Sequence, residues 1–185
     1  MARTPSNMLP LGTKAPNFSI IDSISNKVLC LDDLKGIKGT VIMFICNHCP
    51  FVIHVNSELV KVANTYADKG ISFVAISSND AINYPQDSPE KMKIHAKNED
   101  YPFPYLYDET QEVAKAYDAA CTPDLYVFDD KLELVYRGQL DDSRPGNGIP
   151  LTGKDLRHAL DCLIEGKENK TEQKPSIGCN IKWKH

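Results

Sequence analysis

Short apolar runs alternate along the chain with longer segments whose apolar residues recur at helical spacing. The runs at 41–45 and 71–77 are rich in β-branched residues, which predicts two buried strands. Between them the helical spacing extends from about Cys49 to Asp68, and Gly70 supplies a turn at the helix end. The pattern therefore predicts a strand, a helix and a second strand in a βαβ unit.

Weaker patterns flank this unit on both sides. Ahead of it, the runs at 18–21 and 27–31 predict an N-terminal hairpin. Ser88 and Thr152 are the expected N-caps of two later helices. The proline-broken segment 101–107 is at best a short edge strand, because proline cannot donate to a sheet. The remaining predictions are helices at 88–98, 109–119 and 152–165, and a hairpin of strands at 125–128 and 132–136.

Length and composition favour a single folded domain. The 185 residues are 42% hydrophobic and 25% charged, which suffices for one core. We expect residues 1–10 to be a flexible N-terminus, 11–165 the folded domain and 166–185 a polar C-terminal tail. No internal repeat or second domain is apparent.

The charge balance excludes several classes of function. A net charge of −4 favours neither nucleic acid nor an anionic membrane surface as a partner. The chain begins without an apolar run of signal-peptide length, and no segment has the length and apolarity of a membrane span. We therefore expect a cytoplasmic location, where the six cysteines would be mostly reduced.

The strongest chemical signal follows the first buried strand directly. Cys46 and Cys49 are two residues apart at the junction between that strand and the helix, which is typical of a dithiol–disulfide redox site. A helix N-terminus favours the thiolate, the form that attacks in thiol exchange. We expect Cys46, nearer the open end of the strand, to attack, and Cys49 to resolve the mixed disulfide. Pro50 fits the first helical turn, where its missing N–H costs nothing.

His48 lies between the two cysteines. An imidazole beside a thiolate would lower the thiol pKa further and make the disulfide a stronger oxidant. A solvent-facing histidine without a role is the alternative.

Metal binding is the main alternative for the cysteine pair. Zinc usually takes two such pairs, or one pair with a histidine pair, and only one Cys-x-x-Cys is present. A thiophilic site for Cu(I) or zinc would need Cys46 and Cys49 with His54 or Cys121. Structurally inert cysteines are the remaining possibility.

Several motifs together give the chain a family resemblance. They are Ala15-Pro16-Asn17-Phe18, Cys46-Asn47-His48-Cys49-Pro50, Thr122-Pro123, the segment from Arg137 to Pro145, and the ending from Gly178 to Trp183. With these motifs the chain resembles the thioredoxin superfamily, and within it the AhpC/TSA-type redoxins and a peroxiredoxin-like group with a CNHCP site. The resemblance implies an α/β, thioredoxin-like fold with a central mixed β-sheet flanked by helices. It also implies an N-terminal β-hairpin extension and an extra helix and strand inserted before a cis-proline.

The resemblance also assigns roles around the cysteine pair. It implies that Pro123 is the cis-proline facing the pair, and that the backbone of Thr122 pairs with an incoming substrate segment like an added strand. The reactive cysteine of peroxiredoxins corresponds to Cys49, and they need a Thr or Ser and an Arg beside it. Here Cys46 occupies the position of the Thr or Ser, and Pro123 that of the Arg. A peroxidase of the ordinary kind is therefore not expected. The acidic residue that thioredoxins bury beneath this site has no counterpart here, because Thr40 occupies its position.

Four further cysteines lie outside the pair. Cys121, two residues before Pro123, should lie near Cys46 and is a candidate third redox cysteine. Cys179 is another candidate if the C-terminal tail folds back. For both, a small buried thiol is the alternative. We expect Cys30 and Cys162 to be core residues.

The function that we predict from the sequence is a thiol–disulfide oxidoreductase that needs no cofactor. Its partners would be a protein or small-molecule disulfide and an external thiol reductant, the thioredoxin or glutathione system. The alternatives are a peroxiredoxin-like antioxidant peroxidase with an unfamiliar peroxide pocket, and a Cu(I)- or zinc-binding thiol protein. Edge strands in this family often pair between copies, so the resemblance leaves a homodimer open.

Overall fold

A seven-stranded mixed sheet forms the centre of the computed structural model, which describes residues 3–184. Its strands, in the order β3-β2-β6-β5-β4-β8-β9, are β3 (Val28–Cys30), β2 (Ser19–Asp22), β6 (Tyr105–Tyr107), β5 (Ile71–Ser77), β4 (Gly39–Phe44), β8 (Asp124–Asp129) and β9 (Leu134–Gly138). Strands β4, β5 and β6 run parallel, and the other pairings are antiparallel. The predicted βαβ unit is therefore present as β4, α2 and β5, at the middle of the sheet.

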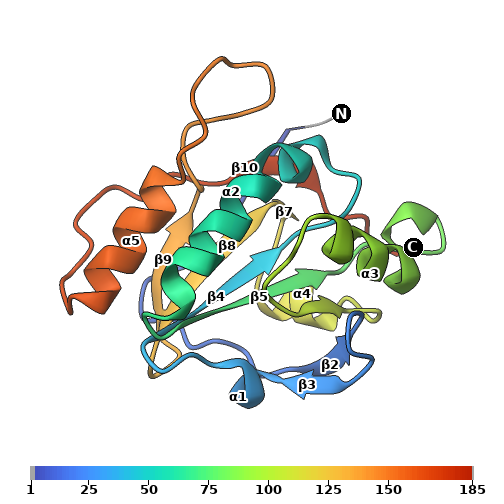
Figure 1. The fold of residues 1–185 in the computed structure, drawn as a ribbon, viewed down its shortest axis with the longest axis horizontal. Helices are drawn as coiled ribbons and strands as arrows, with labels where there is room; N and C mark the ends of the chain where they lie inside the picture. The colour runs from blue at the N-terminus through green and yellow to red at the C-terminus, as the bar shows by residue number, and fades with distance from the viewer. Residues whose placement is uncertain (1–2, 185) are drawn as a thin grey trace.

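Helices cover both faces of this sheet (Figure 1). They are α1 (Leu31–Leu34), α2 (Pro50–Ala67), α3 (Pro89–Asn98), α4 (Glu112–Ala116) and α5 (Lys154–Ile164), with a 3₁₀ turn η1 (Pro85–Asp87). Alternate side chains of β4 point to opposite faces. Val41 and Met43 join the core under α2, α3 and α5, whereas Ile42 and Phe44 join the core with α1 and α4. Burial on both faces explains why β4 is a continuous apolar run.

A second, small sheet joins the two ends of the chain. Its order is β1 (Thr4–Pro5), β10 (Ile177–Asn180) and β7 (Cys121–Thr122), all antiparallel. In Figure 1, β10 lies beside the N-terminal end of α2. Two segments expected in the flexible N-terminus and the polar tail are thus ordered strands, while the expectation for residues 1, 2 and 185 lies outside the described residues.

Three local predictions need correction. The segment 101–107 was expected at most as an edge strand, but β6 lies between β2 and β5 and is fully buried, because its prolines precede the strand. Helix α4 is shorter than the predicted 109–119. Helix α5 is capped by Gly153, in a left-handed conformation with φ 65°, instead of Thr152. The Thr152 amide donates to Asp141.

The remaining predicted elements are confirmed. The N-terminal hairpin forms as β2 and β3, and β8 and β9 form the later hairpin, with a bulge between Val127 and Phe128. Ser88 caps α3, accepting from the Lys91 amide. No helix within residues 3–184 combines the length and the apolar character needed to cross a membrane.

Candidate functional site

The cysteine pair lies where β4 ends and α2 begins. Cys46 follows the strand after one residue, Cys49 is the N-cap of α2, and Pro50 occupies the first helical turn. Both cysteines are buried, Cys46 at 1% and Cys49 at 0% exposure. The local sequence explains this placement, since proline is well suited to a first helical turn and begins the helix immediately after the second thiol.

Three thiols meet at this point. The sulfur of Cys49 lies 2.9 Å from that of Cys179 in a hydrogen bond. The sulfur of Cys49 also lies 3.1 Å from the carbonyl oxygen of Thr122, and the sulfur of Cys46 lies 3.5 Å from the Thr122 hydroxyl. Cys49 is therefore in contact with the C-terminal strand as well as with the residue before Pro123.

The hydrogen bonds stabilise negative charge on Cys49. The hydrogen bond from Cys46 is the main reason that the pKa of Cys49 falls to about 4; burial opposes it, and Cys179 and Thr122 add smaller contributions. The pKa of Cys46 is raised well above its usual range by the same hydrogen bond, by burial and by the charge of Asp87. The pair therefore shares one proton, which Cys46 holds in this state. The sequence analysis expects Cys46 to attack, which requires this proton to move from Cys46 to Cys49.

The Thr122–Pro123 peptide bond is cis, as the resemblance implied. Thr122 pairs with Cys179 in the antiparallel register of β7 and β10. Gly178 is so close that a Cβ atom there would collide with the Thr122 carbonyl oxygen. The edge where the resemblance placed a substrate strand is therefore occupied by the chain's own β10.

Asp87 is a site residue that the sequence analysis missed. Its fully buried carboxylate accepts from the Asn47 amide at 2.9 Å and the Asn79 side chain at 2.8 Å, and lies 2.6 Å from Nδ1 of His48. The His48 ring also stacks on Tyr84 at 5.9 Å between centroids. Local sequence carries no signal for this role, because Asp87 lies in a polar turn and its partners are up to 40 positions away.

Cys121 is buried beside this site. Its thiol donates to the carbonyl oxygen of Pro123 at 3.6 Å, and burial raises its pKa above the usual range. Of the two candidate third cysteines, Cys179 is the one whose sulfur contacts the pair.

The other two cysteines differ from the expected core positions. Cys30 is half-buried at the start of α1, where its thiol donates to Asp33 at 3.0 Å. Cys162 is also half-buried, on α5, with its sulfur 3.7 Å from the His158 ring. Cys30 ends the edge strand β3, and Cys162 lies on α5 in the lining of a cavity, so the core encloses neither thiol.

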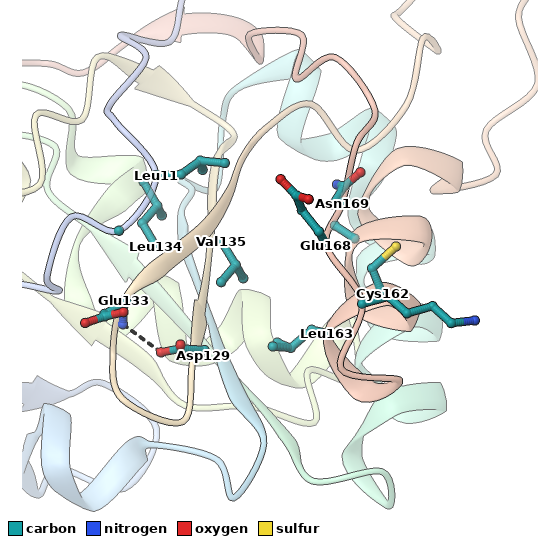
Figure 2. Close-up of a pocket in the computed structure, with 12 residues that line it drawn as sticks. Leu11, Asp129, Glu133, Leu134, Val135, Cys162, Leu163, Glu168 and Asn169 are labelled. Atoms are coloured by element: carbon teal, nitrogen blue, oxygen red, sulfur yellow. Dashed lines mark hydrogen bonds between the residues drawn. The ribbon is translucent and has the colours of Figure 1, made fainter.

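A cavity of about 270 Å³ opens beside Cys162, between α5 and β9 (Figure 2). Leu11, Val135 and Leu163 contribute apolar side chains to its lining. Neither Cys46, Cys49 nor Cys179 lines it. This cavity is therefore separate from the cysteine site.

The metal ligands that the sequence left open as an alternative, Cys46 and Cys49 with His54 or Cys121, do not come together. Nε2 of His54 lies 2.8 Å from the Ser143 hydroxyl, and Cys121 hydrogen-bonds to Pro123. Within residues 3–184, one group of potential ligands comes together: Cys46, His48 and Asp87, with ligand atoms within 4.8 Å of one another. Asp87 already accepts several hydrogen bonds there, which leaves a set poorly matched to the four ligands of a structural zinc.

The fold and this site define a thioredoxin-like protein: a central strand, a Cys-x-x-Cys at the following helix, and a facing cis-proline. The chain belongs to the AhpC/TSA family, whose model matches residues 11–137. It is therefore a redoxin, similar to thiol oxidoreductases.

Solved structures share the fold of this chain. An uncharacterized conserved protein from Geobacillus kaustophilus is 65% identical, with a TM-score of 0.98, covering 100% of this chain and 97% of that one. A hypothetical protein from Sinorhizobium meliloti 1021 is 47% identical, with a TM-score of 0.95 and 98% coverage of both chains. The thioredoxin domain of a thiol-disulfide oxidoreductase from Bacteroides vulgatus shares the fold at 19% identity, with a TM-score of 0.62, covering 82% of this chain and 99% of that one. The comparison with curated proteins gave no match.

Proposed function

We propose that the protein is a thiol–disulfide oxidoreductase in which Cys46 and Cys49 cycle between dithiol and disulfide. The observation that carries this proposal is the placement of the two buried thiols where β4 meets the N-terminus of α2, both against Thr122 of the cis Thr122–Pro123 bond. A thiolate is the attacking species in disulfide exchange, and this pair keeps one thiolate at neutral pH.

The first step uses the hydrogen bond between the two thiols. The Cys46 proton passes to the Cys49 thiolate, and the Cys46 thiolate attacks one sulfur of the substrate disulfide. A Cys46–substrate mixed disulfide forms, and the other substrate sulfur leaves as a thiolate, which takes the proton from Cys49. The regenerated Cys49 thiolate then attacks Cys46 and releases the second substrate thiolate. Two electrons have moved from the pair to the substrate.

The substrate class is a protein or small-molecule disulfide. An external thiol of the thioredoxin or glutathione type would return the pair to the dithiol form. Both thiol systems operate in a reducing compartment, so we propose a cytoplasmic setting.

Reduction of insulin disulfides by the purified protein tests this proposal. We expect the activity to be lost in Cys46→Ser and kept in Cys162→Ser, which removes a half-buried thiol outside the site. Equilibration in glutathione buffers then gives the potential of the pair. A potential of about −270 mV would make the pair a reductant, and one of about −120 mV would make it an oxidant. The proposal is overturned if no Cys46–Cys49 couple forms at any buffer ratio.

Metal binding is the second candidate, since Cys46, His48 and Asp87 come together. It predicts stoichiometric metal in the protein as purified and a loss of that metal in His48→Ala. Reduction of disulfides that is unaffected by a chelator, in a protein without bound metal, would reject it.

A further inference from the structure

Cys179 is held against the redox pair by the backbone on both sides. Within β10, Gly178 pairs with Thr4 of β1, and Cys179 pairs with Thr122 of β7. Beyond the strand, the Lys182 amide donates to the side chain of Asn79 at 2.8 Å. Cys179 is only 3% exposed. A thiol fixed in this way is not an incidental surface cysteine.

We propose that Cys179 is a third redox cysteine, which takes the disulfide from the Cys46–Cys49 pair by attacking Cys49. This inference rests on the proposed function of the pair. The geometry that points to it is the 2.9 Å separation between the sulfurs of Cys49 and Cys179. Cys49 therefore has a thiol partner on each side: Cys46 and Cys179.

The transfer is an ordinary thiol–disulfide exchange within one chain. The Cys179 thiolate attacks the sulfur of Cys49, the Cys46–Cys49 bond breaks, and a Cys49–Cys179 bond forms. Cys46 leaves as the thiolate and takes up the proton that Cys179 gave up. One disulfide is present before and after, so no further oxidant or reductant is needed.

The charges at the site favour transfer after oxidation of the pair. In the reduced protein the pKa of Cys179 is raised to about 12, first by burial and then by the hydrogen bond and the charge of Cys49. A Cys46–Cys49 disulfide carries no charge on Cys49, so those two contributions vanish. The charge of Lys182, which lowers the pKa of Cys179, stays in place. Cys179 thus becomes a better nucleophile once the Cys46–Cys49 disulfide has formed.

The transfer would change which thiol is available. It returns Cys46 to the thiol form while the oxidising equivalent is stored on β10. Because β10 also covers the Thr122 edge, a peptide cannot add there as a strand while β10 stays paired.

Disulfide mapping of the whole protein tests the relay. The protein is oxidised with excess oxidised glutathione, alkylated and digested with trypsin. Cys46 and Cys49 share the tryptic peptide 39–61, and Cys179 lies in 171–182. A Cys46–Cys49 disulfide stays within one peptide, whereas a Cys49–Cys179 disulfide joins two. We expect both forms, with the joined form about half of the oxidised protein if the two disulfides have similar potentials.

Variants separate the relay from the proposed function. Cys179→Ser should lose the joined peptides and retain the Cys46–Cys49 disulfide. Fragmentation of the joined peptides should place the bond at Cys49 rather than Cys46. A wild-type protein that forms the Cys46–Cys49 disulfide without any joined peptides overturns the relay alone. A Cys179→Ser protein that forms no Cys46–Cys49 disulfide overturns the proposed function.

Gly178→Ala tests the positioning without removing a sulfur. Its Cβ would collide with the Thr122 carbonyl, so β10 must move away and the joined form should appear about tenfold more slowly, or not at all. Asn180→Ala is the matched control, because that side chain is exposed on the same strand. Equal rates in the two variants would show that the seating of β10 does not matter, and would contradict the relay.

Discussion

Asp87 and His48 form a buried contact beside the cysteine pair: Oδ2 of the carboxylate lies 2.6 Å from Nδ1 of the ring. The carboxylate is fully buried, while the His48 side chain is 25% exposed. A ring nitrogen facing a carboxylate carries the proton, so Nε2 is the nitrogen left for substrate or solvent. Asp87 thereby fixes the ring and adds a negative charge near Cys46.

Asp87→Asn is expected to make the reduction potential of the Cys46–Cys49 couple less negative. The pKa of Cys46 is raised first by the hydrogen bond with Cys49, then by burial and then by the charge of Asp87. Removing that charge stabilises the thiolate and hence the reduced form, by roughly 30 mV for each 1.4 kcal/mol gained. Glutathione equilibration measures the shift. Asp80→Asn is the control, because Asp80 lies in the same segment and bonds to Asn83. Equal potentials in both variants would assign Asp87 a purely structural role.

The ultraviolet absorbance of the thiolate should report the pKa of Cys49. We expect a thiolate that persists as pH falls to about 4. Cys46→Ala removes the largest stabilising hydrogen bond and should return the pKa toward the ordinary value near 8.5, while Cys179→Ala should raise it less. Cys162→Ala should leave it unchanged. A larger effect of Cys179→Ala than of Cys46→Ala would contradict this ordering.

The low pKa of the Cys49 thiol also makes the free energy of unfolding depend on pH. The folded pKa of Cys49, about 4, lies below the ordinary value near 8.5, so the unfolded chain binds more protons between these limits. The Cys49 contribution is therefore fully present above about pH 8.5 and is lost as pH falls toward 4. Denaturant titrations of the wild type and Cys49→Ala should show a difference in unfolding free energy that shrinks as the pH is lowered. A difference that is constant with pH would rule out this linkage.

A buried ion pair supports the segment around Pro123. Asp124 accepts from Arg137 at 3.1 Å and from the Ala120 amide at 3.2 Å, with both charged side chains fully buried. Arg137→Met leaves a buried carboxyl without its partner, and we expect a loss of roughly 3–5 kcal/mol in unfolding free energy. Burial raises the pKa of Asp124 to about 6 even with Arg137 present. Urea unfolding of Arg137→Met and of the double variant with Asp124→Asn measures this; a double variant no more stable than the single one would contradict it.

Brief alkylation of the reduced protein should modify Cys30 and Cys162 first. Both are half-buried, whereas Cys46, Cys49 and Cys179 are buried. Peptide mass mapping at short times distinguishes the two groups. Rapid modification of Cys179 would show that β10 leaves its place readily in solution.

The central elements were predictable because their patterns are strong and local. Strand β5 matches the apolar run at 71–77, and Pro50 locates the beginning of α2. The cis bond before Pro123 came from the family resemblance, since local sequence seldom specifies it. Cys46 and Cys49 were singled out as the candidate pair from their spacing, and the structure buries both at the predicted junction of strand and helix.

The parts that sequence reasoning missed depend on distant partners. Strand β10 has only four residues, and its neighbours β1 and β7 are two residues each. No periodicity develops over such lengths, so only pairing across the chain defines them. Asp87 was missed for the same reason, since its partners Asn47 and His48 precede it by some 40 positions. The half-buried state of Cys162 follows from where α5 packs, which its helical pattern does not reveal.

The small sheet that joins both chain ends can open without the core, so the cysteine site can be uncovered while the rest of the molecule stays folded. Its two pairings involve few backbone hydrogen bonds, and they close loops that span much of the chain. Segments of this kind open at a lower free energy than the core strands and form a separate cooperative unit. Amide exchange in β1 and β10 should accordingly be faster than in β4 and β5. The cysteine site is thus covered by a segment that opens before the core strands, so a molecule that reaches Cys46 and Cys49 has to overcome only the cost of that local opening.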